Sequence, residues 1–259
     1  TLFPYTTLFR SVLGWTLYEY RDTLDASGLT PKLLSTLKYF TDFILKAHPN
    51  ATTLYYEVGD GNSDHGYWGP PELQTTARPT KKVTASGSGS DVCGQASAAL
   101  ALMYLNYQTT DATYANRCLT ASQELYDLGL TALGRSDGGS FYPSSSHYDD
   151  LAWAAVWQHV TGGPLSLLDQ VGTWMDTEQN DYGDDNYDKH WSPAWDDCTV
   201  FVMLKMAELT QQSKYRYGVT NNLEWYSDEC TRTPYGLPWL DSWGVLRYAS
   251  AEAGVGYLA

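Results

Sequence analysis

Two neighbouring stretches decide the fold: VCGQASAALALMYL at residues 92–105 and YANRCLTASQELYDLG at residues 114–129. The first is apolar around almost its whole circumference when wound as a helix, whereas the second has one apolar and one polar face. A helix that is apolar all round belongs in the interior, and a two-faced helix covers it. The pair therefore predicts a helical hairpin with one inner and one outer member.

The same pattern recurs along the chain, with short loops inside the pairs and long loops between them. It predicts nine helices at 12–27, 31–47, 91–107, 113–133, 149–161, 164–178, 195–210, 213–228 and 238–258. Paired inner and outer helices without intervening strands are typical of an α/α barrel. The long loops 48–90, 134–148, 179–194 and 229–237 each precede an inner helix. We expect them at one end of the ring, where a binding cleft would lie.

The charge of the chain excludes several classes of partner. Sixteen Lys and Arg face 30 Asp and Glu, which gives a net charge of -14. This charge repels phosphate backbones and anionic lipid, so we expect no nucleic-acid partner and no membrane partner. The chain also has no apolar run of about 18 residues that could span a bilayer. Ten Trp and 21 Tyr instead favour a neutral partner that stacks on rings, such as a polysaccharide.

The four cysteines, Cys93, Cys118, Cys198 and Cys230, match no zinc-binding spacing. An even number permits two disulfides in an oxidising compartment. Three of the four fall in apolar helical stretches, which is equally typical of buried thiols. Both interpretations stay open at this point.

The loop LYYEVGDGNSDHGYWGPPELQTTARP, residues 54–79, crowds aromatic rings into a segment that glycines and prolines keep out of regular helix. Rings held at a surface beside polar groups are suited to binding sugars. The loop closely resembles the corresponding loop of glycoside hydrolase family 9, the inverting cellulases, and the resemblance extends over residues 12–259. It implies an all-α fold, an incomplete (α/α)6 barrel with about nine of twelve helices, and a β-glucan such as cellulose as partner.

Further motifs carry the same resemblance: FYPSSSHYDDLAW at 141–153, KHWSPAWDD at 189–197 and TPYGLPWLDSWGVLRYA at 233–249. In the aromatic loop and in these three motifs, the resemblance implies substrate-binding roles for seven residues: His65, Trp68, Tyr142, Trp191, Trp243, Arg247 and Tyr248. The alternative for Trp243 is a structural position in the core, since large rings in apolar helices are often buried.

Adjacent carboxylates Asp149 and Asp150 stand in the first turn of a predicted helix. Helix capping alone would explain one of them. Together with nearby serine oxygens they also suit a hard cation. The resemblance implies a structural Ca²⁺ held by Ser146, Asp149, Asp150 and Asp196, although His147 and Asp150 replace the family's Gly and Glu.

The catalytic pair of the family is missing from the sequence. Inverting hydrolysis needs a general acid and a general base about 6.5 to 9.5 Å apart. The family supplies them from Asp-Ala-Gly-Asp-His and Asn-Glu-Val motifs, and neither occurs here. We expect an extracellular endo-β-1,4-glucanase as the parent protein, with a signal peptide outside this fragment, and no activity in the chain itself. A non-catalytic carbohydrate-binding protein and another α/α-barrel enzyme, such as a polysaccharide lyase, are the alternatives.

Three further expectations concern the first eleven residues, the flanks of the inner helices and one acidic loop. TLFPYTTLFRS at 1–11 reads like a translated sequencing adapter, so we expect a non-native segment followed by a partial catalytic domain at 12–259. Absent neighbours would leave the flanks of inner helices exposed as apolar patches. The acidic run 181–188 is expected to be a solvated surface.

Overall fold

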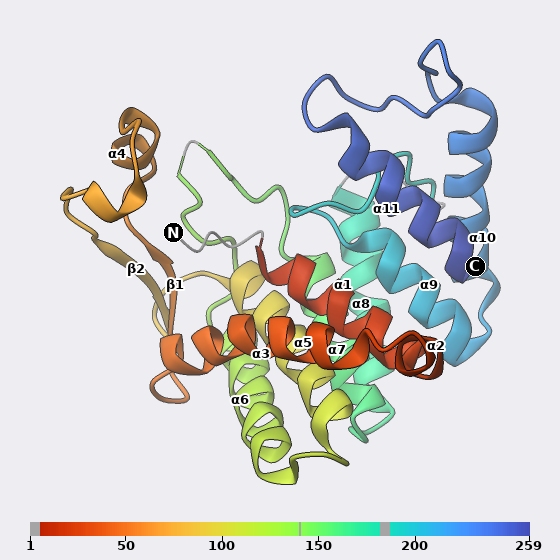
Figure 1. Cartoon of the computed structure of the whole chain (residues 1–259). Helices are drawn as coiled ribbons and strands as arrows, with labels where there is room; N and C mark the ends of the chain where they lie inside the picture. The colour runs from red at the N-terminus through yellow and green to blue at the C-terminus, as the bar shows by residue number, and fades with distance from the viewer. Residues whose placement is uncertain (1–5, 140, 182–186) are drawn as a thin grey trace. The chain divides into compact units, whose positions relative to one another are not determined.

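The structure, a computed structural model, describes residues 6–139, 141–181 and 187–259. The chain divides into two units, unit 1 at Thr1–His147 and unit 2 at Tyr148–Ala259 (Figure 1). Each unit is described by itself. The remaining positions, 1–5, 140 and 182–186, lie outside the described residues, and so does most of the acidic run expected at 181–188.

Unit 1 is built around the predicted inner helix. Apart from α4 (Gly61–Gly66) in the aromatic loop, its helices are α1 (Thr6–Glu19), α2 (Arg21–Ala26), α3 (Thr30–Ala47), α5 (Ser90–Tyr107) and α6 (Ala112–Thr131). Helix α5 is buried at every position from Ser90 to Met103, whereas α6 buries one face that includes Cys118 and Leu125. Helices α1 and α3 also pack on α5. The inner and outer members predicted from the sequence are thereby confirmed for this pair.

A β-hairpin stands where the sequence predicted only loop. Strand β1 (Thr53–Val58) pairs antiparallel with β2 (Thr80–Thr84), and a bulge lies between Tyr55 and Glu57. The segment between the strands carries α4 (Gly61–Gly66) and a 3-10 turn, η1 (Pro71–Leu73). Figure 1 shows α4 beyond the end of this hairpin. The hairpin thus carries the aromatic loop away from the helices of its unit.

Unit 2 contains two helical hairpins and a final helix. Its elements are α7 (Tyr148–Val160), α8 (Ser166–Asp181), α9 (Thr199–Thr210), α10 (Ser213–Glu224), the π-helical turn η2 (Trp225–Glu229) and α11 (Val245–Leu258). Helix α7 is buried from Asp149 to Gln158, and α9 from Thr199 to Met206. Gly218 lets α10 approach α9 closely, because a β-carbon at this position would collide with the sulfur of Met203 in α9. The predicted inner character of α7 and α9 is confirmed.

Helix α11 differs from the other predicted inner helices. It buries only Tyr248, Glu252 and Val255, while Leu246 is 69% exposed and Tyr257 is 76% exposed. Helix α11 is therefore apolar but covered on one side only.

Several boundaries differ from the sequence expectation. Helix α1 begins at Thr6 inside the segment expected to be non-native, and Arg10 and Ser11 are buried there. Helix α9 begins at 199 instead of 195, because an isolated bridge joins Ala194 to Asp197. Helix α11 begins at 245 instead of 238, since Pro238 pairs with Arg232. The predicted 12–27 helix is interrupted at residue 20, between α1 and α2.

The four cysteines are thiols and form no disulfide among the described residues. Cys93, Cys118, Cys198 and Cys230 are all free and buried. In the part of the chain that the structure describes, no helix has the length and apolarity needed to cross a bilayer.

Candidate functional site

The aromatic loop of unit 1 forms an open pocket with a volume of about 620 Å³. Trp68 is fully exposed on this pocket, at 101% of its reference area. The lining combines aromatic faces with charged and amide groups, which is the composition expected of a sugar site. The lining residues are Asp64, His65, Tyr67, Trp68, Gly69, Pro71, Gln74 and Arg78.

Asp64 holds this pocket together. Its Oδ1 accepts a hydrogen bond from Gln74 Nε2 at 2.9 Å and an ion-pair contact from Arg78. Arg78 also donates to the carbonyl of Val58 at 3.1 Å, at the end of β1. The guanidinium lies over Gly59, where a β-carbon would come within 2.6 Å of Arg78 Cζ and the φ angle is +106°. Asp64 therefore ties α4 to the C-terminal part of the aromatic loop, and Arg78 ties that part to the end of β1.

The predicted binding residue His65 lies at the end of α4. Its ring stacks on Phe141 with a centroid distance of 3.9 Å and an interplanar angle of 9°. Its Nδ1 is 2.8 Å from the carbonyl oxygen of Gly61. Because Nδ1 faces the Gly61 carbonyl, Nε2 is the ring nitrogen left for a hydrogen bond to a ligand.

The loop that carries Phe141 is fastened to the hairpin and to α5. Lys81 donates to the carbonyl of Asp137 at 2.9 Å. Asp91 accepts from the amide and the hydroxyl of Ser136, at 2.8 and 2.7 Å. Burial raises the pKa of Asp91, and the two Ser136 hydrogen bonds partly oppose that rise. Tyr142, predicted to contact substrate, is half-buried in this loop and does not line the pocket.

In unit 2 the predicted residues Trp191, Arg247 and Tyr248 lie together. Trp191 is 38% exposed and meets Tyr248 edge to face, at a centroid distance of 5.5 Å and an angle of 66°. Tyr248 is only 3% exposed, so Trp191 is the ring of this pair that faces solvent. The Arg247 guanidinium lies 4.5 Å from the centroid of the Tyr248 ring.

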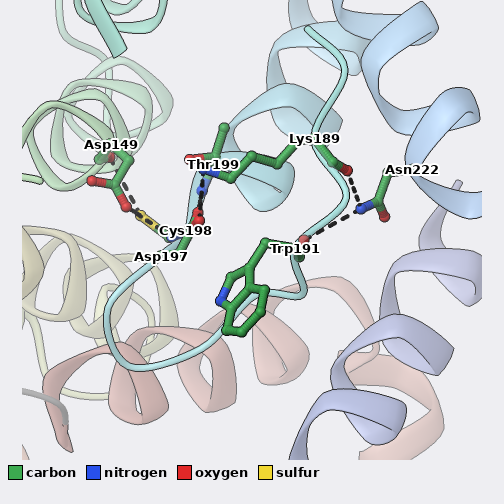
Figure 2. Close-up of polar contacts among 7 residues, drawn as sticks. All are labelled: Asp149, Lys189, Trp191, Asp197, Cys198, Thr199 and Asn222. Carbon is green, nitrogen blue, oxygen red and sulfur yellow. Dashed lines mark hydrogen bonds and ion pairs between the residues drawn. The ribbon is translucent and has the colours of Figure 1, made fainter. Parts of the chain in front are cut away.

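The backbone beside Trp191 is held from two sides, as Figure 2 shows. The amide of Asn222 donates to the carbonyls of Lys189 and Trp191, at 2.7 and 3.3 Å. The Lys189 ammonium is 2.9 Å from Asp197, whose other oxygen accepts from the Thr199 amide at 2.9 Å. These contacts fix the loop that presents Trp191.

Trp243 lies in the loop before α11 and is 78% exposed, so the core interpretation of this ring does not apply. Tyr235 in the same loop is 96% exposed and was not singled out by the sequence. Arg232 connects this loop to η2, because its guanidinium donates to the carbonyl of Gly236 at 3.2 Å and to the carbonyl of Tyr226.

Two of the four predicted calcium ligands come together in unit 2. Oxygen atoms of Asp149 and Asp150 and the sulfur of Cys198 lie within 4.8 Å of one another, and all three residues are buried. Asp149 Oδ2 accepts from the Cys198 amide at 2.8 Å, and the thiol donates to the same oxygen at 3.4 Å (Figure 2). Asp196 does not belong to this group. Ser146 is buried and lies at the end of unit 1.

Comparison with known proteins identifies the family of the chain. The sequence profile of Glycosyl hydrolase family 9 matches residues 6–259. Endoglucanase 4 of Bacillus sp. (strain KSM-522) is 31% identical over 96% of this chain, and the Endoglucanase of Dictyostelium discoideum is 33% identical over 96%. The chain spans 41% and 36% of the length of these relatives.

Comparison with solved structures also finds cellulases and endoglucanases. The crystal structure of the cellulase Cel9M of C. cellulolyticum in complex with cellobiose matches all of this chain at 41% identity, with a TM-score of 0.96. The Endoglucanase from the termite Nasutitermes takasagoensis matches 99% of this chain at 28% identity, with a TM-score of 0.91. The chain covers 60% and 59% of those two structures. These matches confirm the predicted fold class, an incomplete (α/α)6 barrel, and the chain belongs to glycosyl hydrolase family 9.

Proposed function

We propose that this chain is the glucan-binding part of the catalytic domain of a secreted, inverting endo-β-1,4-glucanase. The observation that carries the proposal is the match, over the whole chain, to a cellulase solved in complex with cellobiose. A net charge of -14 suits an uncharged polymer, and exposed tryptophans supply stacking faces for its sugar rings.

Each unit contributes its own contacts in this proposal. In unit 1, Trp68 stacks on a glucosyl ring while His65 Nε2 binds a sugar hydroxyl. In unit 2, Trp191 and Trp243 are the stacking faces, Arg247 binds hydroxyls and Tyr248 supports Trp191. Tyr142 is retained as a rim contact from the family resemblance.

Bond cleavage requires groups that the 259 residues do not supply. An inverting enzyme protonates the leaving oxygen with one carboxyl and activates water with another across the sugar ring. The motifs that carry this pair in the family do not occur in the sequence. We therefore assign binding to this chain and hydrolysis to the longer protein, which the endoglucanase relatives favour over a purely binding protein.

We also propose that the acidic group of unit 2 holds a structural Ca²⁺. Asp149 and Asp150 offer the hard oxygen atoms that this ion prefers. The sulfur of Cys198 is a soft donor that Ca²⁺ does not prefer, so the two carboxylates are the ligands that this group offers to the ion. The oxygen donors fit the ion, and Ser146 and Asp196 are further ligands implied by the family.

The test combines binding with turnover on the complete 259-residue chain. We expect saturable binding of cellotetraose by calorimetry and no new reducing ends from carboxymethylcellulose. A variant with both Trp68→Ala and Trp243→Ala keeps the net charge but loses two of the three proposed stacking faces, so it serves as the reference and should bind more weakly. Release of reducing ends by the chain itself would overturn the division between binding and hydrolysis. A complete failure to bind cello-oligosaccharides would overturn the glucan assignment.

A further inference from the structure

Glu252 is a buried carboxyl in α11 for which the proposed function has no use. It is 5% exposed. Among the described residues, no hydrogen bond of normal geometry reaches either of its carboxyl oxygens, and the Ser192 hydroxyl is the polar group that lies near them. A carboxylate in such a place would be costly, because burial without a compensating partner strongly disfavours the charged form. The residue is therefore expected to be present as the neutral acid.

Two hydroxyl groups lie near Glu252. The hydroxyl of Tyr226, in η2, is buried and also lacks a partner among the described residues. Burial raises the pKa of the Tyr226 phenol, and a charge on the nearby Glu252 carboxyl raises it further. The Ser192 hydroxyl lies beside both groups, and it donates to the carbonyl of Tyr248 at 3.1 Å. Glu252, Tyr226 and Ser192 form what we call the buried polar cluster.

Electrostatics agree with a neutral acid in this cluster. Burial raises the pKa of Glu252 to about 8, the nearby Ser192 hydroxyl lowers it in part, and the charge of Asp197 raises it further. The titratable or charged groups near Glu252 are Tyr226 in η2 and Asp197 with its partner Lys189 before α9, and Tyr226 in turn has Cys230 and Tyr248 near it.

The buried polar cluster lies next to the ring pair that unit 2 presents. Ser192 directly follows Trp191 in the chain. Tyr248 and Glu252 are four residues apart on α11, so they share one face of that helix. Trp191 rests edge-on against Tyr248. A charge that appeared on Glu252 would have to gain water or a partner, which requires its neighbours to rearrange.

We propose that Glu252 is a positioning residue: as an uncharged acid it supports the Trp191–Tyr248 pair, and on ionisation it withdraws that support. The glucan-binding consequence rests on the proposed function, whereas the effect on the ring pair does not. Affinity for a cello-oligosaccharide should then fall in alkaline solution although the sugar itself carries no charge.

The first experiment observes the ring pair without ligand. The full chain is labelled with fluorotryptophan, and the Trp191 resonance is assigned with Trp191→Phe. We expect this resonance to shift with a midpoint near pH 8 in the wild type and to stay constant in Glu252→Gln. Glu224→Gln, an exposed glutamate in α10, is the matched control and should titrate like the wild type. Equal titration in all three proteins would overturn the proposal.

The second experiment adds cellotetraose and measures its dissociation constant by calorimetry on both sides of that midpoint. We expect about a tenfold loss of affinity on the alkaline side for the wild type and for Glu224→Gln, since a tenfold change corresponds to one pKa unit of coupling. Glu252→Gln should lose less than about twofold, well inside that unit. Parallel losses in all proteins would contradict the role of Glu252.

The two proposals fail in different ways. Absence of binding at every pH, with the resonance shift intact, rejects the glucan assignment and leaves the support by Glu252 standing. Should Glu252→Gln fail to fold, carboxyl-carbon titration of the wild type with labelled glutamate decides instead. A midpoint for Glu252 in the ordinary glutamate range would then reject the proposal.

Discussion

The two units hold their aromatic surfaces by opposite electrostatic means. In unit 1 a charged pair, Asp64 with Arg78, ties the pocket loop together at a partly exposed position. In unit 2 a buried carboxyl, Glu252, shares one face of α11 with Tyr248 of the ring pair, and burial raises its pKa. Charged pairs near solvent are screened by salt, whereas a buried acid responds to protons instead. The loops therefore share a proposed ligand but should respond to different solution conditions.

The largest expected effect concerns the pH dependence of stability. Folding raises the pKa of Glu252 from 4.5 to about 8, so the folded state holds a proton that the unfolded state has released between these values. The stabilisation is complete below the lower value and is lost as pH rises through the higher one, at about 1.4 kcal/mol per pH unit.

Glu252→Gln should remove this slope, so that the variant exceeds the wild type in stability by several kcal/mol at alkaline pH. Urea unfolding across the window measures it, with Glu224→Gln as control. Identical pH profiles for wild type and Glu252→Gln would contradict the buried neutral acid.

The next effect concerns the proposed calcium ion in unit 2. Added Ca²⁺ at about 100 times its dissociation constant should stabilise the chain by about 2.7 kcal/mol through mass action. Asp150→Asn should abolish the gain, whereas Asp169→Asn, an exposed aspartate in the first turn of α8, should keep it. Thermal unfolding with Ca²⁺, Mg²⁺ or a chelator checks this. An unchanged melting temperature in the wild type would reject the ion.

A smaller effect is expected at the charged pair of unit 1. Asp64→Ala removes the acceptor shared by Gln74 and Arg78, which should weaken cellotetraose binding by about 1–3 kcal/mol through loss of the loop geometry. Asp127→Ala, an exposed aspartate in α6, is the control. Binding by the wild type should also weaken with added salt, and the Asp64→Ala variant should lose that salt dependence. Equal salt dependence in both proteins would show that the pair does not shape the pocket.

The sequence predicted the helices well because their burial is a property of whole segments. The apolar run of α5 and the two-faced pattern of α6 each specify one environment over many residues. The hairpin was missed because TLYYEV is short and its partner strand begins 22 residues after it ends at Val58. Boundaries at Cys198 and Gly244 depend on local bridges and turns, which periodicity does not encode.

The candidate site was predictable only in its rings. Family resemblance located Trp68, Trp191 and Trp243, and the structure leaves all three open to solvent to some degree. The groups that hold these rings, Asp64 and Glu252, look like ordinary surface charges in the sequence. Their roles arise from contacts with residues distant in the chain or from burial, and neither is visible in spacing.

The proposal that each unit presents glucan-binding tryptophans is tested by calorimetric titration of cellotetraose into single-ring variants. We expect Trp68→Ala and Trp243→Ala each to weaken binding about tenfold, or about 1.4 kcal/mol, through loss of one stacking face. Tyr39→Ala in unit 1 and Tyr257→Ala in unit 2 remove exposed rings outside the loops and should leave affinity unchanged. Affinities that are equal in all five proteins, the wild type included, would contradict it.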